Sequence, residues 1–162
     1  MKYLTPLVKG LITGLVMVTA TLVMLHFDVP AESNIQFLVY AIYAGGIIWT
    51  LLAYAKTPEY KGTFGELFGQ GFRCFIIVTI VMVSFVGIFS FTHPEIAEEQ
   101  AVINRQMLKE EKDKTPDEIE KQVQKAKDNF VITSMYSAIF GTMIIGVIFT
   151  VAGTALVLIR RK

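Results

Sequence analysis

The sequence predicts an all-α integral membrane protein with four transmembrane helices and an extramembrane helical hairpin between helices 3 and 4. The first observation is four apolar segments, which comprise residues 5–27, 35–55, 72–92 and 130–159. Each can cross the hydrocarbon core of a bilayer, which takes about 20 helical residues. The second is that 17 of the 29 charged residues lie within 93–129. We therefore expect a single membrane domain over 1–162, with a charged helical insert at 94–129.

Basic residues beside the short loops predict the orientation. They form three clusters, which are Lys2 and Lys9 before the first span, Lys56, Lys61 and Arg73 around the second loop, and Arg160, Arg161 and Lys162 at the C-terminus. By the positive-inside rule, both termini face the cytoplasm of a bacterium, and 93–129 lies outside the inner membrane, in the periplasm. Seven basic residues in 93–129 argue the other way, but ten acidic residues are mixed with them.

The ends of the first two spans also fit a membrane protein. No small-x-small cleavage site follows the first apolar run before Pro30, so we expect a retained span rather than a signal peptide. Trp49, Tyr54 and Tyr60 fit an aromatic belt at the cytoplasmic interface. Lys9 lies near enough to that interface for its ammonium group to reach water.

The segment before the third span has the pattern of an interfacial helix. Apolar residues recur there at helical spacing, at Phe64, Leu67, Phe68 and Phe72. We expect this helix to lie at the membrane surface and to lead into the third span. That span should end before Pro94, because the residue before a proline is disfavoured in the helical region.

The insert should form two charged helices. One starts near Glu95. The second starts at Pro116, because Thr115 and Glu118 have the spacing of a capping box and a proline occupies the first helical position. Helix starts of this kind are among the strongest local signals in a sequence.

Each insert helix has one apolar stripe, so the two should pack as an antiparallel hairpin. The stripes comprise Ile96, Ile103 and Met107 on the first helix, and Ile119, Val123, Ala126 and Phe130 on the second. Counting outward from the turn pairs Met107 with Val123 and Ile103 with Ala126. Ten acidic and seven basic residues give 93–129 a net charge of minus three. Such a segment would repel nucleic acid, so we expect no nucleic-acid partner.

Small residues at helical spacing predict close helix packing. The fourth span has a ridge of Ser134, Ala138, Thr142, Gly146, Thr150 and Thr154, and the first span has Gly10 and Gly14. Small side chains let helix backbones approach where lipid gives no hydrophobic drive. We predict packing roles for Gly10, Gly14, Ala138, Thr142, Gly146 and Thr150. Packing within the bundle is the favoured interpretation, and oligomerisation or partner binding is the alternative.

The spans offer little for catalysis. No Asp or Glu lies in a span interior, whereas coupled carriers usually need an intramembrane ionisable group. No metalloprotease motif, catalytic triad candidate or pair of intramembrane acids is present, so we expect neither an enzyme nor a cofactor. Cys74 is the only cysteine, which excludes an intramolecular disulfide.

One set of residues at the outer ends of the spans could bind a metal. His26 and Asp28 follow the first span, and His93 and Glu95 follow the third. Imidazole and carboxylate groups together are a plausible zinc set. The plainer interpretation, which we favour, is that polar residues mark where each helix leaves the bilayer.

The segments together resemble a known family. A Phe-Gly-x-x-Phe-x-x-Gly-Phe stretch, here Phe64 to Phe72, leads into the third span, Pro94 follows that span, and a charged helical insert precedes the last span. In these features the chain is similar to the small Bacteroidetes-type membrane proteins of domain of unknown function 4199. The resemblance implies a four-helix inner-membrane protein and supplies no activity, cofactor or site residue.

Two function hypotheses stay open. The first is a non-enzymatic bundle for structure, assembly or partner binding, whose partners are the lipid bilayer and either another envelope protein or a second copy. The alternative is an uncoupled small transporter or channel component that acts as an oligomer. An oligomer would be needed because four helices pack without leaving a channel.

Overall fold

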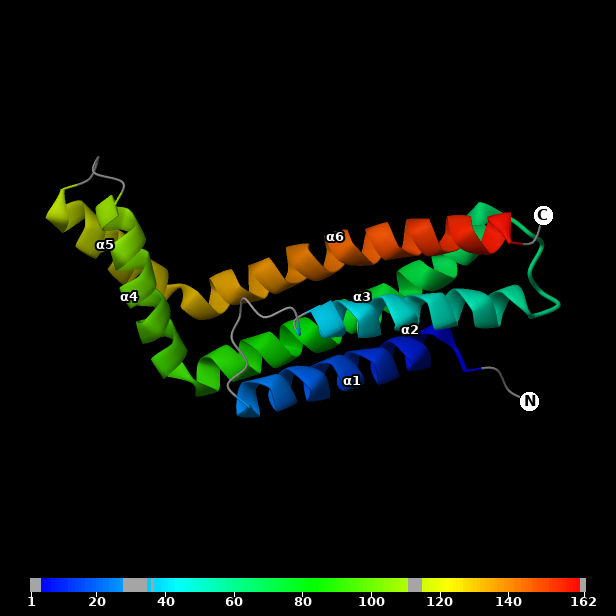
Figure 1. Cartoon of the computed structure of the whole chain (residues 1–162), viewed down its shortest axis with the longest axis horizontal. Helices are drawn as coiled ribbons and strands as arrows, with labels where there is room; N and C mark the ends of the chain where they lie inside the picture. Colours follow the sequence, from blue (N-terminus) through cyan, green and yellow to red (C-terminus); the bar gives the residue numbers. More distant parts are fainter. Residues whose placement is uncertain (1–3, 28–34, 36, 111–114, 161–162) are drawn as a thin grey trace. The chain divides into compact units, whose positions relative to one another are not determined.

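The computed structural model describes residues 4–27, 35, 37–110 and 115–160. These residues contain six α-helices, in the order α1 (Pro6–His26), α2 (Phe37–Ala55), α3 (Phe64–Thr92), α4 (Pro94–Glu110), α5 (Pro116–Asp128) and α6 (Phe130–Ile159) (Figure 1). Four of them, α1, α2, α3 and α6, are long and apolar enough to cross a membrane. The predicted all-helical fold with four apolar spans is therefore confirmed, and the protein is a multi-pass membrane protein.

The chain forms two compact units. The first unit comprises Met1–Met82 with Ile139–Lys162, and the second comprises Val83–Ala138. The helices α3 and α6 each contribute residues to both. The two units are described separately below.

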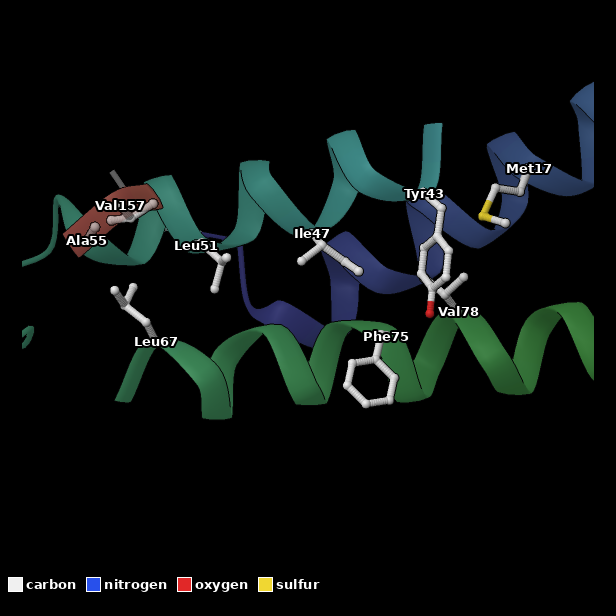
Figure 2. Close-up of a cluster of buried hydrophobic side chains, with 9 residues drawn as sticks. All are labelled: Met17, Tyr43, Ile47, Leu51, Ala55, Leu67, Phe75, Val78 and Val157. Atoms are coloured by element: carbon white, nitrogen blue, oxygen red, sulfur yellow. The ribbon is translucent and has the colours of Figure 1, made fainter. Parts of the chain in front are cut away.

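The core of the first unit is built around one face of α2. Tyr43, Ile47, Leu51 and Ala55 recur every four residues along that helix and are all buried. Residues of the other three helices complete the cluster, namely Met17, Leu67, Phe75, Val78 and Val157 (Figure 2). Large apolar residues elsewhere on the spans are exposed, as a surface that contacts lipid requires.

The structure differs from the sequence prediction before the third span. Instead of a separate interfacial helix, α3 runs without a break from Phe64 to Thr92. Gly62, at a φ of 87°, lies two residues before α3 begins. The segment can continue into the span because it contains no proline, and one of its three glycines, Gly71, packs closely against Thr150.

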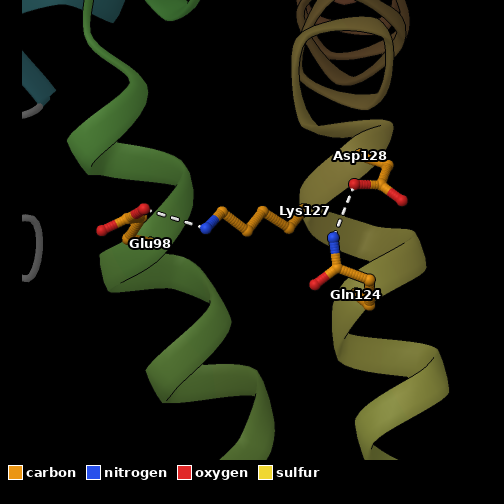
Figure 3. A network of polar contacts seen from close by, with 4 residues as sticks. All are labelled: Glu98, Gln124, Lys127 and Asp128. Atoms are coloured by element: carbon orange, nitrogen blue, oxygen red, sulfur yellow. Dashed lines mark hydrogen bonds and ion pairs between the residues drawn. The ribbon is translucent and has the colours of Figure 1, made fainter.

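In the second unit, α4 and α5 pack antiparallel. Two ion pairs join them, Arg105 to Glu120 at 2.8 Å and Lys127 to Glu98 at 2.9 Å. Figure 3 shows Lys127 reaching from α5 to Glu98 on α4. The predicted start of α5 is confirmed, since the Glu118 carboxylate accepts the backbone N–H of Thr115 at 2.9 Å just before Pro116.

The predicted apolar contact between these helices is wrong on the α4 side. The buried cluster joins Ala101 to Ile119 and Val123, with Leu108 packed against it. Ile103 and Met107, which the sequence paired with α5, are 46% and 52% exposed. Alanines at 97 and 101 let the two helices approach, so the small residues face α5 and the larger ones point aside. On α5 the stripe is right at Ile119 and Val123, whereas Ala126 is exposed.

Candidate functional site

The first unit has a cavity of about 620 Å³ where α1 begins and α2 ends. Residues from the first turn of α1, from the end of α2 with the turn after it, and from α3 line this cavity. Its polar lining includes Lys9, Thr50, Tyr54, Glu59, Gln70 and Arg73. We refer to it below as the Lys9 cavity.

Lys9 is the most unusual residue of the cavity, because its side chain is buried. The residue is 5% exposed, and its ammonium nitrogen lies 5.6 Å from the centre of the Trp49 ring. The sequence predicts that the Lys9 ammonium group reaches water at the membrane surface, whereas the structure buries the Lys9 side chain. The ring of Trp49, which the sequence analysis assigned to an aromatic belt, supplies a cation–π contact to the ammonium group.

Close helix packing turns Lys9 inward. The next residue, Gly10, lies against α3, and a Cβ atom on Gly10 would be 2.5 Å from the Cys74 carbonyl oxygen. Because no side chain separates the two backbones, α1 approaches α3 and brings Lys9 with it. The Thr13 hydroxyl, one turn later, donates a 2.8 Å hydrogen bond to the Lys9 carbonyl oxygen.

The cavity has more positive than negative charge. Arg73 on α3 and Lys9 on α1 are cationic, and Glu59 is the only acid among the lining residues. Within the described ranges of the chain, no carboxylate lies within ion-pair distance of Lys9 or Arg73. The cation–π contact only partly replaces what the Lys9 ammonium loses on leaving water, since it uses none of the three N–H donors.

Thr50 gives the cavity lining a polar and well-packed part. Thr50 is fully buried, and its hydroxyl lies 2.9 Å from the Gly46 carbonyl oxygen and 3.3 Å from the Cys74 sulfur. Cys74 is a free, buried thiol. These contacts fix the position of Thr50 in the cavity lining.

The residues of the hypothetical zinc site are separated between the two units. His26 belongs to the first unit, whereas His93 and Glu95 belong to the second, and Asp28 lies outside the described residues. The His93 ring stacks on Phe89 with ring centres 4.2 Å apart. No group of three or more His, Cys, Asp or Glu side chains that could hold a metal is found in the part of the chain that the structure describes. The pairing of His26 with His93 stays a prediction.

Several predicted packing residues lie at close contacts in the first unit. A Cβ atom on Gly14 would be 2.9 Å from the Cβ atom of Val81, and one on Gly146 would be 2.9 Å from the Phe75 ring. Thr150 is fully buried. The Thr142 carbonyl oxygen accepts a 3.0 Å hydrogen bond from the Tyr43 hydroxyl. Ala138 is half-buried and belongs to the second unit, so the ridge on α6 extends across both units.

From the sequence, Lys9 and Arg73 were used to predict the orientation, the Lys9 ammonium group was expected at the interface, and the cavity was missed. One signal was present, because Lys9 directly precedes Gly10 of the small-residue motif and lies four residues before Thr13. A residue at that place belongs to the packed face of the helix rather than to its lipid face.

Comparison with known proteins gives one match. A family model described as "Protein of unknown function (DUF4199)" matches residues 9–158. No curated protein and no solved structure matches the chain.

Proposed function

The chain belongs to the family of proteins of unknown function DUF4199, and we propose that it is a non-enzymatic inner-membrane component that binds another envelope protein. In this proposal the protein lies in the inner membrane of a Bacteroidetes-type bacterium, and 93–129 lies on the periplasmic side. In this proposal the spans anchor the protein, and the α4–α5 pair makes the contact.

The observation that supports partner binding is an apolar flank of α4 that α5 does not cover. Ile96, Ile103 and Met107 are spaced by seven and four residues, so they lie on one side of the helix. Ile103 and Met107 are about half exposed. Beside this flank lies a cavity of about 450 Å³ whose lining includes Ile96, Gln100, Asn104 and Phe130. An apolar surface on an otherwise charged helix favours a binding role.

Charge indicates the kind of partner. Acidic residues outnumber basic ones in 93–129 by ten to seven, so two copies would repel each other across this surface. An apolar segment with Lys or Arg residues complements both the flank and its charge. We therefore propose a basic, amphipathic segment of a different envelope protein as the occupant.

Photo-crosslinking in intact cells tests this proposal. A photoreactive amino acid in place of Gln100, which lines the cavity beside the flank, should form one adduct with a different envelope protein. Mass spectrometry should map the adduct to a basic, apolar segment of that protein. Met107→Asp should abolish the adduct, whereas Gln122→Asp at an exposed position of α5 should leave it intact. The proposal is wrong if the only adduct is with a second copy, or if none forms.

The orientation has its own test. In a Cys74→Ser background, Lys61→Cys and Lys121→Cys place single thiols at exposed positions in the second loop and on α5. In cells with a permeabilised outer membrane, an impermeant maleimide should label Lys121→Cys and not Lys61→Cys. The reverse pattern would place α5 in the cytoplasm, because the reagent reaches only periplasmic thiols.

The structure gives less support to a channel formed between copies. Such a channel would need polar side chains on the outer surface of the bundle, where a second copy could meet them. Thr13, Thr50, Thr150 and Thr154 are buried within the first unit of a single chain, whereas Thr19 and Ser84 are exposed. The four buried threonines cannot line a pore between subunits without a rearrangement of the bundle.

A further inference from the structure

The Lys9 cavity contains a buried cation that packing alone does not require. Lys9 is 95% inaccessible to solvent and lines the cavity, and no described acid forms an ion pair with it. A buried ammonium group is unfavourable unless anions or hydrogen-bond acceptors surround it. A methionine of similar length would fill the same space without that penalty.

The other groups around the cavity supply what an anion needs. Arg73 and Gln70 are three residues apart on α3, so they share one face and bring guanidinium and amide donors to the same opening. The first turn of α1 also lines the cavity, and the positive end of its helix dipole adds to the potential there. A volume of about 620 Å³ is within the range of small-molecule sites.

We propose that the Lys9 cavity binds a phosphate group, held by the Lys9 ammonium and Arg73 guanidinium groups. The phosphate belongs either to the headgroup of an anionic phospholipid or to a small soluble phosphate ester, since both present the same anion. Glu59 at the cavity wall opposes this charge and limits the affinity. This role is independent of the partner contact proposed for α4.

Native mass spectrometry of the full chain in detergent tests the proposal. Dioleoylphosphatidylglycerol serves as the lipid probe, sn-glycerol 3-phosphate as the soluble ester, and uncharged dioleoylglycerol as a probe without phosphate. We expect one molecule of phosphatidylglycerol per chain. Lys9→Met should weaken its binding by about tenfold or more, because a charge-assisted contact is lost. Arg73→Gln should act in the same direction, and this variant should keep its fold because Arg73 is exposed.

Two further variants make the test specific. Lys56→Met removes one positive charge from a different cavity, which Arg160 also lines, and it should leave binding unchanged. Glu59→Gln should strengthen binding, because it removes the opposing charge. The thermal midpoint of Lys9→Met should equal or exceed that of the parent chain, which separates lost binding from lost folding.

The probes also distinguish the two sources of phosphate. If glycerol 3-phosphate binds and displaces the lipid, with the same pattern across the variants, the ligand is a soluble ester. If glycerol 3-phosphate neither binds nor displaces the lipid, the ligand is the lipid. The proposal is overturned if dioleoylglycerol binds as tightly as phosphatidylglycerol, if Lys9→Met and Lys56→Met lose binding equally, or if no phosphate probe binds.

Discussion

The helices of the first unit and the α4–α5 pair hold together by different means. In the first unit, the apolar cluster around α2 is accompanied by close contacts at glycine and threonine, as where Gly10 meets the Cys74 carbonyl and Gly71 meets Thr150. Between α4 and α5 the contacts are a small apolar cluster around Val123 and two ion pairs at its edges. The two units therefore differ in chemistry as well as in composition.

This difference follows from the solvent that each helix pair meets. Lipid tails are as apolar as leucine, so burying leucine between spans gains little, and close backbone approach supplies the packing energy. A charged helix pair in water gains from burying Ile119 and Val123 in the ordinary way. The spans thus combine the apolar cluster around α2 with close approach at small residues, whereas α4 and α5 combine an apolar stripe with ion pairs.

The largest effect should come from filling a close contact in the first unit. A methyl group added at Gly146 would meet the Tyr43 hydroxyl and the Phe75 side chain, so Gly146→Ala should destabilise the protein by about 1 to 3 kcal/mol. Gly141→Ala makes the same change on the same helix, where no atom lies within 4 Å. Thermal unfolding in detergent should show a lower midpoint for the first variant only, and equal midpoints would contradict glycine-mediated packing.

A smaller effect should come from the core of the α4–α5 pair. Ile119 is 6% exposed, so Ile119→Val should cost about 0.5 to 1.5 kcal/mol through lost packing. Ile103→Val removes the same methylene group from a side chain that is 46% exposed, and its cost should be near zero. Amide hydrogen exchange in the full chain measures the opening of this pair. Equal exchange in both variants would support the stripe predicted from sequence over the observed one.

How far the fold can be read from the sequence depends on the element. The spans were predictable because a bilayer fixes their length, and the start of α5 because Thr115, Pro116 and Glu118 are a local signal. The face of α4 that packs against α5 could not be predicted. Two faces of that helix are candidates, one with Ile103 and Met107 and the other with Ala97 and Ala101. Hydrophobicity favours the first pair, whereas the need for close approach selects the second.

The Lys9 cavity could not be predicted from local pattern. Its lining comes from residues far apart in the sequence, such as Lys9, Glu59 and Arg73, and only the packing of three helices joins them. A lysine near the end of a span usually extends to the interface, so this general rule predicts an exposed Lys9 side chain, whereas the structure has a buried one. The exception arises from Gly10, whose missing side chain brings α1 against α3.

The smallest effect concerns the ion pairs that distinguish the α4–α5 pair from the spans. The Lys127 ammonium group donates a 2.9 Å hydrogen bond to Glu98 and lowers the pKa of that carboxyl from its usual 4.5. A carboxyl with a lowered pKa in the folded state adds stability above its unfolded pKa, and this contribution is lost as the pH falls through the folded pKa. The contribution is small because water and salt screen the exposed pair.

Replacing Lys127 should therefore move the titration of Glu98 in a known direction. In Lys127→Met the Glu98 pKa should rise toward its ordinary value, because both the hydrogen bond and the opposite charge are gone. Lys125→Met removes the same charge from an exposed position of the same helix and should change the Glu98 pKa much less. Carboxyl carbon NMR of the full chain in detergent measures the titration directly. Equal shifts in the two variants would mean that the overall charge of α5, rather than the contact in Figure 3, sets the Glu98 pKa. The Lys127–Glu98 contact would then add little to the link between α4 and α5, which would rest on the apolar cluster and on the ion pair of Arg105 with Glu120.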